Sequence, residues 1–283
     1  MSSIKTVGIV GAGTMGNGIA QACATSGIRA VMVDISEAAV QKGLATLSGS
    51  LDRLLKKEKI SAAERDAALA LVQGSTNYDD LKGADLVIEA ATENLELKLR
   101  ILRQLDGLLP AGTLIASNTS SISITQLAAA TSRAERFIGM HFFNPVPMMA
   151  LVEVIRGLQT SDATHDAVHE LALKLGKTPV SVRNAPGFVV NRILVPMINE
   201  AFFVLAEGVS SAEDIDAGMK LGCNHPIGPL ALADMIGLDT CLAIMNVYFD
   251  EFQDSKYRAA PLLREMVAAG RLGRKSGRGV YAY

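Results

Sequence analysis

A glycine-rich turn near the start of the chain has the residue types that hold a dinucleotide pyrophosphate. The apolar run at residues 6–10 leads directly into GAGTMG, which matches the GxGxxG pattern. In such a turn the first glycine permits the sharp bend, the second lets the backbone approach the pyrophosphate, and the third lets the next helix pack closely. The N–H groups at the start of that helix favour anions. We therefore expect phosphate contacts from Gly11, Gly13, Thr14, Met15 and Gly16.

An aspartate after the next apolar run is a candidate for contact with the adenosine ribose. Asp34 directly follows residues 30–33 and lies 21 positions beyond Gly13. At this spacing a carboxylate accepts hydrogen bonds from the ribose hydroxyls, and its charge would repel a 2′-phosphate. Asp34 therefore favours NAD over NADP. The alternative to a dinucleotide site is a glycine-rich turn followed by an unrelated surface aspartate. That alternative does not explain why a strand precedes the turn and a helix and a second strand follow it.

A histidine and a glutamate in two apolar runs form a candidate acid–base pair. His141 lies near the end of residues 137–142, and Glu153 lies within residues 151–155. Side-chain alternation places Glu153 on a face with aliphatic neighbours, where an unpaired carboxylate is costly to bury. A carboxylate on one imidazole nitrogen fixes the tautomer, so the other nitrogen can remove an alcohol proton while hydride leaves to a nicotinamide. On this pattern alone, a core histidine and a glutamate that reaches solvent at a sheet edge remain equally open.

The elements around these candidates are typical of a doubly wound α/β fold with a mostly parallel sheet. Strand-like runs occur at residues 6–10, 30–33, 86–89, 114–117, 137–142, 151–155 and 179–182. Helix-like segments occur between them at residues 14–26, 37–55, 95–109, 123–130 and 164–175. This alternation predicts βαβ units of Rossmann type. Polar segments 90–94 and 117–121 follow strand ends, which is the edge where such sheets bind ligands.

The last hundred residues predict a separate, smaller all-α domain. Helix-like segments at residues 188–207, 212–221, 230–250 and 261–269 follow Pro186. We therefore place an NAD-binding domain at residues 1–184 and a helical domain, which would contribute to the substrate cleft, at 185–283. Because a small and very apolar helical domain often completes its core against a copy of itself, we expect a homodimer.

Composition narrows the function class. The chain has 283 residues, of which 49% are hydrophobic and 20% charged, with a net charge of −2. Such a chain can build a large core, and it lacks the basic excess that binding to nucleic acid or an anionic membrane needs. It has no 18-residue apolar run, no room for a signal peptide and three widely spaced cysteines, so we expect a cytoplasmic protein.

His165 and His169 are one helical turn apart but lack a third ligand, so no metal site is expected.

Several longer motifs, in order and with matching gaps, resemble one enzyme family over essentially the whole chain. Besides GAGTMG, they are ENLELK, SNTSS, HFFNPVPMM, LVEV, NAPGFVVNRIL, HPIGPLALADMIGLD and GRKSGRGVYAY. The chain resembles the L-3-hydroxyacyl-CoA dehydrogenase family, and within it the short bacterial 3-hydroxybutyryl-CoA type. This implies reversible, NAD-dependent oxidation of a short (S)-3-hydroxyacyl-CoA to the 3-oxoacyl-CoA. Fatty-acid metabolism is one of several pathways that need this step, and the sequence does not choose among them.

The resemblance also implies roles for matched positions. His141 would be the general base in oxidation and the general acid in reduction, with Glu153 orienting it. Ser120 and Asn191 would bind the substrate oxygens. The positions that match NAD contacts in the family are Asp34, Glu93, Lys98, Asn144 and Lys275.

The acyl-CoA substrate would have its own contacts. Ser50 and Lys57 match positions near the coenzyme A moiety. The run KKEK at residues 56–59 is compatible with an anionic nucleotide tail, and on the run alone a solvated helix end is the alternative.

Three other functions are compatible with a fold of this type. A sugar-acid dehydrogenase of the gulonate type would share the cofactor site, and direct substrate assays separate the two. A non-catalytic, crystallin-like NAD-binding protein would not need the intact set of His141, Glu153, Ser120 and Asn191. A dehydrogenase of the 6-phosphogluconate type would use a catalytic lysine on the interdomain helix, where this chain has Asn191 and Arg192.

Overall fold

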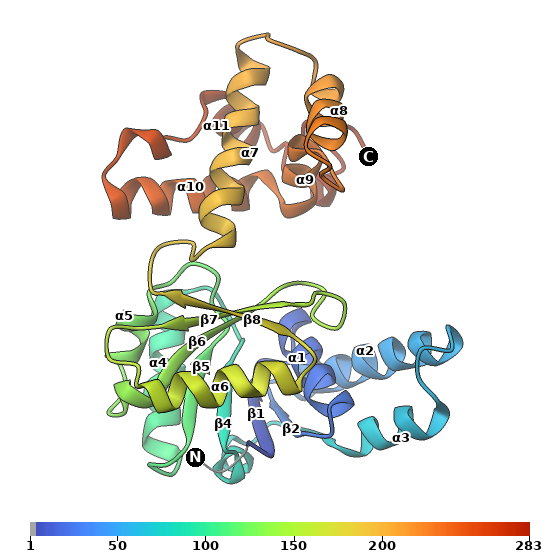
Figure 1. Ribbon diagram of the computed structural model, residues 1–283, viewed down its shortest axis with the longest axis vertical. Helices are drawn as coiled ribbons and strands as arrows, with labels where there is room; N and C mark the ends of the chain where they lie inside the picture. The colour runs from blue at the N-terminus through green and yellow to red at the C-terminus, as the bar shows by residue number, and fades with distance from the viewer. Residues whose placement is uncertain (1–3) are drawn as a thin grey trace. The chain divides into compact units, whose positions relative to one another are not determined.

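The computed structural model describes residues 4–283, which divide into two compact units, one ending at Ala185 and one from Pro186 to Tyr283 (Figure 1). The first unit is built on an eight-stranded sheet with the order β3-β2-β1-β4-β5-β6-β7-β8. Its strands are β1 (Thr6–Val10), β2 (Arg29–Val33), β3 (Val72–Ser75), β4 (Leu86–Glu89), β5 (Leu114–Ser117), β6 (Phe137–Phe142), β7 (Leu151–Arg156) and β8 (Thr178–Arg183). All neighbouring strands pair in parallel except β6 with β7.

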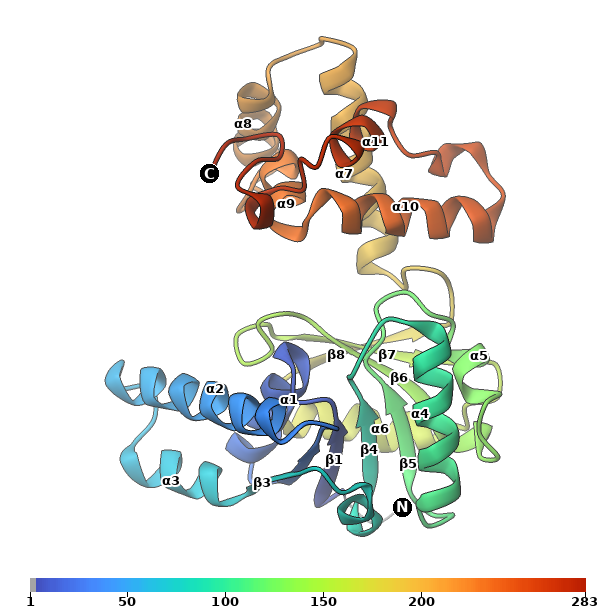
Figure 2. The ribbon, with the colours of Figure 1, turned by 180° about the vertical axis from the view of Figure 1, so that it is seen from behind.

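Helices cover both faces of this sheet (Figures 1 and 2). The helices of the unit are α1 (Thr14–Thr25), α2 (Glu37–Lys56), α3 (Ala62–Ala70), α4 (Leu95–Leu108), α5 (Ile124–Ala128) and α6 (Asp162–Lys174). Apolar side chains of α1, α2 and α6 pack with one face of the strands, and α4 and α5 cover the other. The central strands β4 and β5 are buried along their whole length, as expected for parallel strands between two helical layers. The fold is therefore the predicted Rossmann-like α/β sheet.

Local sequence signals set where the helices begin. The Ser36 side chain accepts the Ala39 N–H at the start of α2, and Asn94 does the same for Leu97 at the start of α4. Ser61 and Glu64 form a reciprocal capping box at the start of α3. Helix α1 has no such cap, because its N-cap is Gly13 of the glycine-rich turn. Its first N–H groups are therefore not taken by a capping side chain.

The second unit consists of helices around its own core. They are α7 (Val190–Ala206), α8 (Ala212–Gly222), α9 (Pro229–Ile236), α10 (Leu238–Phe252) and α11 (Pro261–Ala268). Ile198, Phe202, Leu230 and Leu263 are fully buried at the centre. No single helix within residues 4–283 has the length and apolar composition to cross a bilayer; α9 and α10, which meet at 97°, pass that criterion only when taken together as one bent pair.

One predicted helix was wrong, and two elements were missed. The single helix expected over residues 230–250 is two helices. Gly237 adopts φ +106°, which is not a helical conformation, and so ends α9 before α10 begins. Helix α3 and strand β3 were not predicted at all. Both are short, and β3 is a four-residue edge strand that is only half-buried and contains a glycine, so it lacks the alternation that marks a strand.

The glycine-rich turn gives a stability prediction. A Cβ on Gly16 would lie 1.8 Å from the Gly11 carbonyl oxygen, whereas one on Gly49, in the middle of α2, would touch only the end of the Arg53 side chain at 3.7 Å. We expect Gly16→Ala to lower the free energy of unfolding by about 1–3 kcal/mol, as overpacking does. Gly49→Ala, the control, should raise it by about 0.5–1 kcal/mol because alanine favours the helix. Urea unfolding measures both, and an unchanged midpoint for Gly16→Ala would contradict the close packing described.

Candidate active site

The predicted acid–base pair forms across the one antiparallel strand pair of the described sheet. Strands β6 and β7 are paired in a register that puts His141 directly opposite Glu153. The Nδ1 atom of His141 lies 2.7 Å from Oε2 of Glu153, and their side chains are 8% and 1% exposed. A carboxylate oxygen only accepts hydrogen bonds, so Nδ1 carries the proton and Nε2 is the basic atom of the neutral ring. The arrangement can therefore take up a proton at Nε2 and stabilise the resulting imidazolium through Glu153.

Two side chains hold the chain around His141: Asn118, from the polar segment 117–121 noted in the sequence, and Lys177, which the sequence analysis missed. The Asn118 side chain, after β5, accepts the Phe142 N–H at 2.8 Å and so ties the end of β6 to its parallel neighbour. Lys177 donates from Nζ to the carbonyls of Val146 and Met149, at 2.6 and 2.9 Å, in the loop that links β6 to β7. Burial lowers the pKa of the Lys177 ammonium. An interior lysine at the start of a strand is a signal that could have singled it out.

The carboxyl edge of β1 and β2 fits the pyrophosphate and ribose of NAD. Gly11 adopts φ +106°, and a Cβ there would lie 2.7 Å from the Ala90 carbonyl oxygen, so only glycine makes this turn. Apart from Gly13 and its two chain neighbours, no atom of residues 4–283 lies within 4 Å of the position that a Gly13 Cβ would take, and a side chain would fill space open to a phosphate. The Asp34 carboxylate accepts the Ala12 N–H at 2.9 Å and is thereby held beside the turn at the end of β2.

A hollow beside Asp34 has aliphatic, aromatic and cationic side chains in its lining, which suit the base and ribose of an adenosine. Its walls come from the ends of β1 and β2, from the segment before β4 and from α4, and they include Ile35, Tyr78, Leu97 and Arg100. Burial raises the pKa of the Tyr78 phenol, and the charges of Asp34 and Glu89 add to this. Sequence reasoning missed these side chains, because nothing in their spacing brings four separate segments to one place.

Polar groups converge at the carboxyl ends of β4 and β5. Glu93 accepts the Ser120 backbone N–H at 2.6 Å and the Ser120 hydroxyl at 2.9 Å on one oxygen, and the Thr119 hydroxyl at 2.8 Å on the other. Lys98 is 1% exposed and its Nζ lies 2.5 Å from Oε2 of Glu89. The expected segments 90–94 and 117–121 therefore do meet at this edge.

Comparison with known proteins decides the family. The model of the 3-hydroxyacyl-CoA dehydrogenase NAD-binding domain matches residues 6–185, and that of the C-terminal domain matches residues 187–283. The chain belongs to the 3-hydroxyacyl-CoA dehydrogenase family. It is thus an NAD-dependent oxidoreductase that acts on an acyl-CoA substrate, and the non-catalytic alternative is wrong.

Individual relatives are similar over their full length. The crystal structure of the (S)-3-hydroxybutyryl-CoA dehydrogenase PaaH1 from Ralstonia eutropha is 72% identical, with a TM-score of 0.98 and 99% of each chain covered. The 3-hydroxybutyryl-CoA dehydrogenase of Bradyrhizobium diazoefficiens is 52% identical over 99% of this chain and 96% of its own. The 3-hydroxybutyryl-CoA dehydrogenase of Clostridioides difficile is 52% identical over 97% of this chain and 98% of its own.

The remaining predicted residues of the dehydrogenase lie in other places. Asn144 is exposed in the loop after β6. Ser50 is half-buried in α2, and Lys57 is the exposed C-cap of that helix. Asn191 and Lys275 belong to the second unit, in the first turn of α7 and near the C-terminus, where Lys275 donates to Asp239 at 2.7 Å. Their contacts with ligands stay predictions. No group of three potential metal ligands occurs in the described part of the chain.

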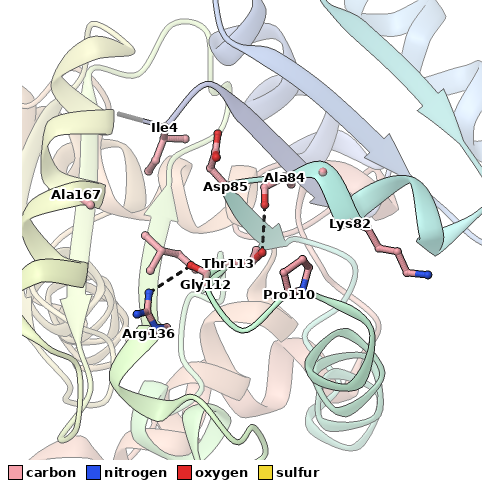
Figure 3. Close-up of a pocket in the computed structure, with 11 residues that line it drawn as sticks. Ile4, Lys82, Ala84, Asp85, Pro110, Gly112, Thr113, Arg136 and Ala167 are labelled. Carbon is pink, nitrogen blue, oxygen red and sulfur yellow. Dashed lines mark hydrogen bonds between the residues drawn. The ribbon is translucent and has the colours of Figure 1, made fainter. Parts of the chain in front are cut away.

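A further hollow lies at the opposite edge of the sheet, where strands β4, β5 and β6 begin (Figure 3). Two of its polar side chains form hydrogen bonds with backbone carbonyls. Thr113 donates to the Ala84 carbonyl at 3.2 Å, and Arg136 donates to the Gly112 carbonyl at 3.3 Å. The described residues that line it include none of the predicted site residues. The residues predicted for the cofactor and catalytic sites of this unit therefore lie outside this hollow.

The position of Asp34 predicts its effect on cofactor choice. Asp34→Ala should lower the ratio of kcat/KM for NADH to kcat/KM for NADPH roughly tenfold or more, since hydrogen bonds to a charged group are worth about 1.5–3 kcal/mol and the charge that repels a 2′-phosphate is lost. Asp66→Ala, on the exposed side of α3, is the control and should leave the ratio unchanged. An unchanged ratio in Asp34→Ala would show that this carboxylate does not contact the ribose.

Proposed function

We propose that this dehydrogenase catalyses the reversible oxidation of (S)-3-hydroxybutyryl-CoA to acetoacetyl-CoA. The observation that carries the proposal is the buried His141–Glu153 pair, which lies on the sheet whose carboxyl edge fits NAD. The four-carbon chain length is supported by the printed names of the relatives, which are 3-hydroxybutyryl-CoA dehydrogenases at 52% and 72% identity.

The chemistry of the pair follows from its geometry. In oxidation Nε2 of His141 accepts the proton of the C3 hydroxyl, and in reduction the imidazolium returns it to the C3 oxygen. Glu153 stabilises the cationic ring, and this attraction is strong because both side chains are shielded from water. When bound, NAD supplies the hydride acceptor. The protein's share is therefore proton transfer and positioning.

Further residues are assigned by the same proposal. Ser120 and Asn191 would contact the substrate oxygens and fix C3 for hydride transfer. The Ser120 hydroxyl donates its proton to Glu93. While this hydrogen bond is kept, the hydroxyl oxygen can only accept further hydrogen bonds, for example from the C3 hydroxyl of the substrate. Ser50 and Lys57 would contact the coenzyme A moiety.

The assembly and location of the protein also stay proposals. Ile193 and Met235 in the helical unit are apolar and more than half exposed, which supports a homodimer formed through this unit. A cytoplasmic location fits a metabolic enzyme of this class.

One assay tests the substrate. Reduction of acetoacetyl-CoA, followed by loss of NADH absorbance, should have a higher kcat/KM than reduction of a longer 3-oxoacyl-CoA, and oxidation of gulonate with NAD should be undetectable. NADPH in parallel should be a poor donor. Turnover of gulonate without turnover of acetoacetyl-CoA would refute the proposed function.

A substitution tests the catalytic base. His141→Gln removes the proton acceptor and should lower kcat by roughly 10²–10⁴, the usual contribution of acid–base catalysis, while the Kd for NADH stays unchanged. His169→Gln is the matched control, because this half-buried histidine lies on α6, where its ring lies beside that of His165 and not beside Glu153. Near-normal turnover in folded His141→Gln would exclude His141 as the base.

A further inference from the structure

The first turn of α7, which carries Asn191, is joined to the rest of its helix less firmly than an ordinary helical turn. Pro196 lies inside α7. Because proline has no N–H, the carbonyl of residue 192, four positions earlier, loses its helical hydrogen bond, and the proline ring crowds that carbonyl. At the other end the N-cap is Val189, whose side chain has no oxygen to accept a hydrogen bond from the first turn. The position of Asn191 therefore depends on contacts outside the helical ladder.

Arg192, the neighbour of Asn191, makes such a contact with two aromatic rings. Its guanidinium carbon lies 3.6 Å from the centre of the Phe252 ring and 4.8 Å from that of Tyr257. Phe252 is the last residue of α10, and Tyr257 ends the short 3-10 helix that follows. A planar guanidinium is attracted by the faces of aromatic rings and packs flat on them. Within residues 4–283 the Arg192 side chain forms no ion pair and no hydrogen bond, so the rings hold it.

The rings under the guanidinium are themselves fixed by close packing. Tyr257 is 6% exposed, and its ring centre lies 5.0 Å from that of Phe252. Val195, which directly precedes the proline of α7, is 2% exposed and belongs to the same apolar cluster. A platform packed in this way can hold the first turn of α7 in one orientation.

One face of α7 is thus fastened to the chain after α10 on both sides of Pro196. Before the proline the contact is the stack of Arg192. After it, Asn199 donates to the Arg258 carbonyl at 3.1 Å and accepts the Ala260 N–H at 2.8 Å. Residues seven positions apart share a helix face, so Arg192 and Asn199 point the same way, and the residue before Arg192 is turned from this face by about 100°. The stack therefore sets the direction of the predicted substrate contact.

We propose that Arg192 is a positioning residue, whose stack on Phe252 and Tyr257 holds the first turn of α7 so that Asn191 keeps its place for the substrate. The stack offsets the hydrogen bond that Pro196 removes at the carbonyl of the same arginine. The inference rests on the proposed function, because it takes Asn191 as a contact of the substrate oxygens.

The first test removes the planar cation and keeps the length of the side chain. In Arg192→Met, kcat/KM for acetoacetyl-CoA should fall roughly tenfold or more, since a small misplacement of a contacting residue slows the reaction strongly. The Kd for NADH from fluorescence titration should stay within roughly threefold of the wild type, because this turn has no assigned cofactor contact. Arg192→Lys keeps the charge without the flat stack and should recover only part of the loss.

The matched control is Arg258→Met. It removes the same kind of contact near the other end of α7, where the guanidinium carbon lies 4.5 Å from the centre of the Phe203 ring. Both quantities should stay unchanged in this variant. A folded Arg192→Met protein with wild-type kcat/KM would overturn the inference.

A double-mutant cycle tests whether Arg192 acts through Asn191. In Asn191→Ala the substrate contact is already gone, so adding Arg192→Met should change kcat/KM by less than roughly twofold. Phe252→Leu, which removes the nearer ring, should by itself reproduce the loss of Arg192→Met. A loss of equal size with and without Asn191 would overturn the inference, because Arg192 would then act on stability or on another contact.

Amide hydrogen exchange gives a readout that needs no turnover. In Arg192→Met the amides of residues 192–195 should exchange roughly tenfold faster or more than in the wild type, while those of residues 200–206, beyond Pro196, keep their rates. Unchanged exchange of residues 192–195 would count against the inference. If the wild type failed to reduce acetoacetyl-CoA, the proposed function would fail, but the exchange rates would still show whether Arg192 holds this turn.

Discussion

The hydrogen bond between His141 and Glu153 depends on one exception in the sheet, the antiparallel pairing of β6 with β7. Two residues face each other across an antiparallel pair only in one register, and a shift by one residue would turn Glu153 to the other face. The register is held because the middle of β7 is buried and because Lys177 fastens the connecting loop. Strand pairing, loop anchoring and burial together keep Nδ1 of His141 at 2.7 Å from Oε2 of Glu153.

The parallel part of the sheet has a different task, which is to bring polar loops to one edge. The strand order runs outward in both directions from β1 and β4, so the chain segments after these two strands separate and leave a crevice at their carboxyl ends. The glycine-rich turn and Asp34 lie on one side of it, and Glu93 and Ser120 on the other. An antiparallel sheet could not collect these segments, because alternate strands would end at opposite edges.

The sequence predicted those parts of the fold and site that depend on local pattern. Strands with continuous apolar runs, the glycine-rich turn and Asp34 were found because each has a signature within about 35 residues. The break at Gly237 could not be predicted, since only the backbone conformation shows that this glycine interrupts the helical pattern and does not continue it. The hollow beside Asp34 was missed for another reason: Tyr78 and Arg100 come together only through tertiary packing. Glu89 had a signal like that of Glu153, a carboxylate within an apolar strand, and could have been found by it.

These two glutamates show how the partner decides what a buried carboxylate does. Both lie on strands of one sheet, and both accept a hydrogen bond from a nitrogen at 2.5–2.7 Å. Free imidazole changes its charge near neutral pH, so a carboxylate beside it can support proton transfer during turnover. An alkyl ammonium keeps its proton well above neutral pH, so a carboxylate beside it makes a fixed contact. The same residue type can thus support proton transfer on β7 and a fixed ionic contact on β4, and the difference arises from a single neighbouring side chain in each case.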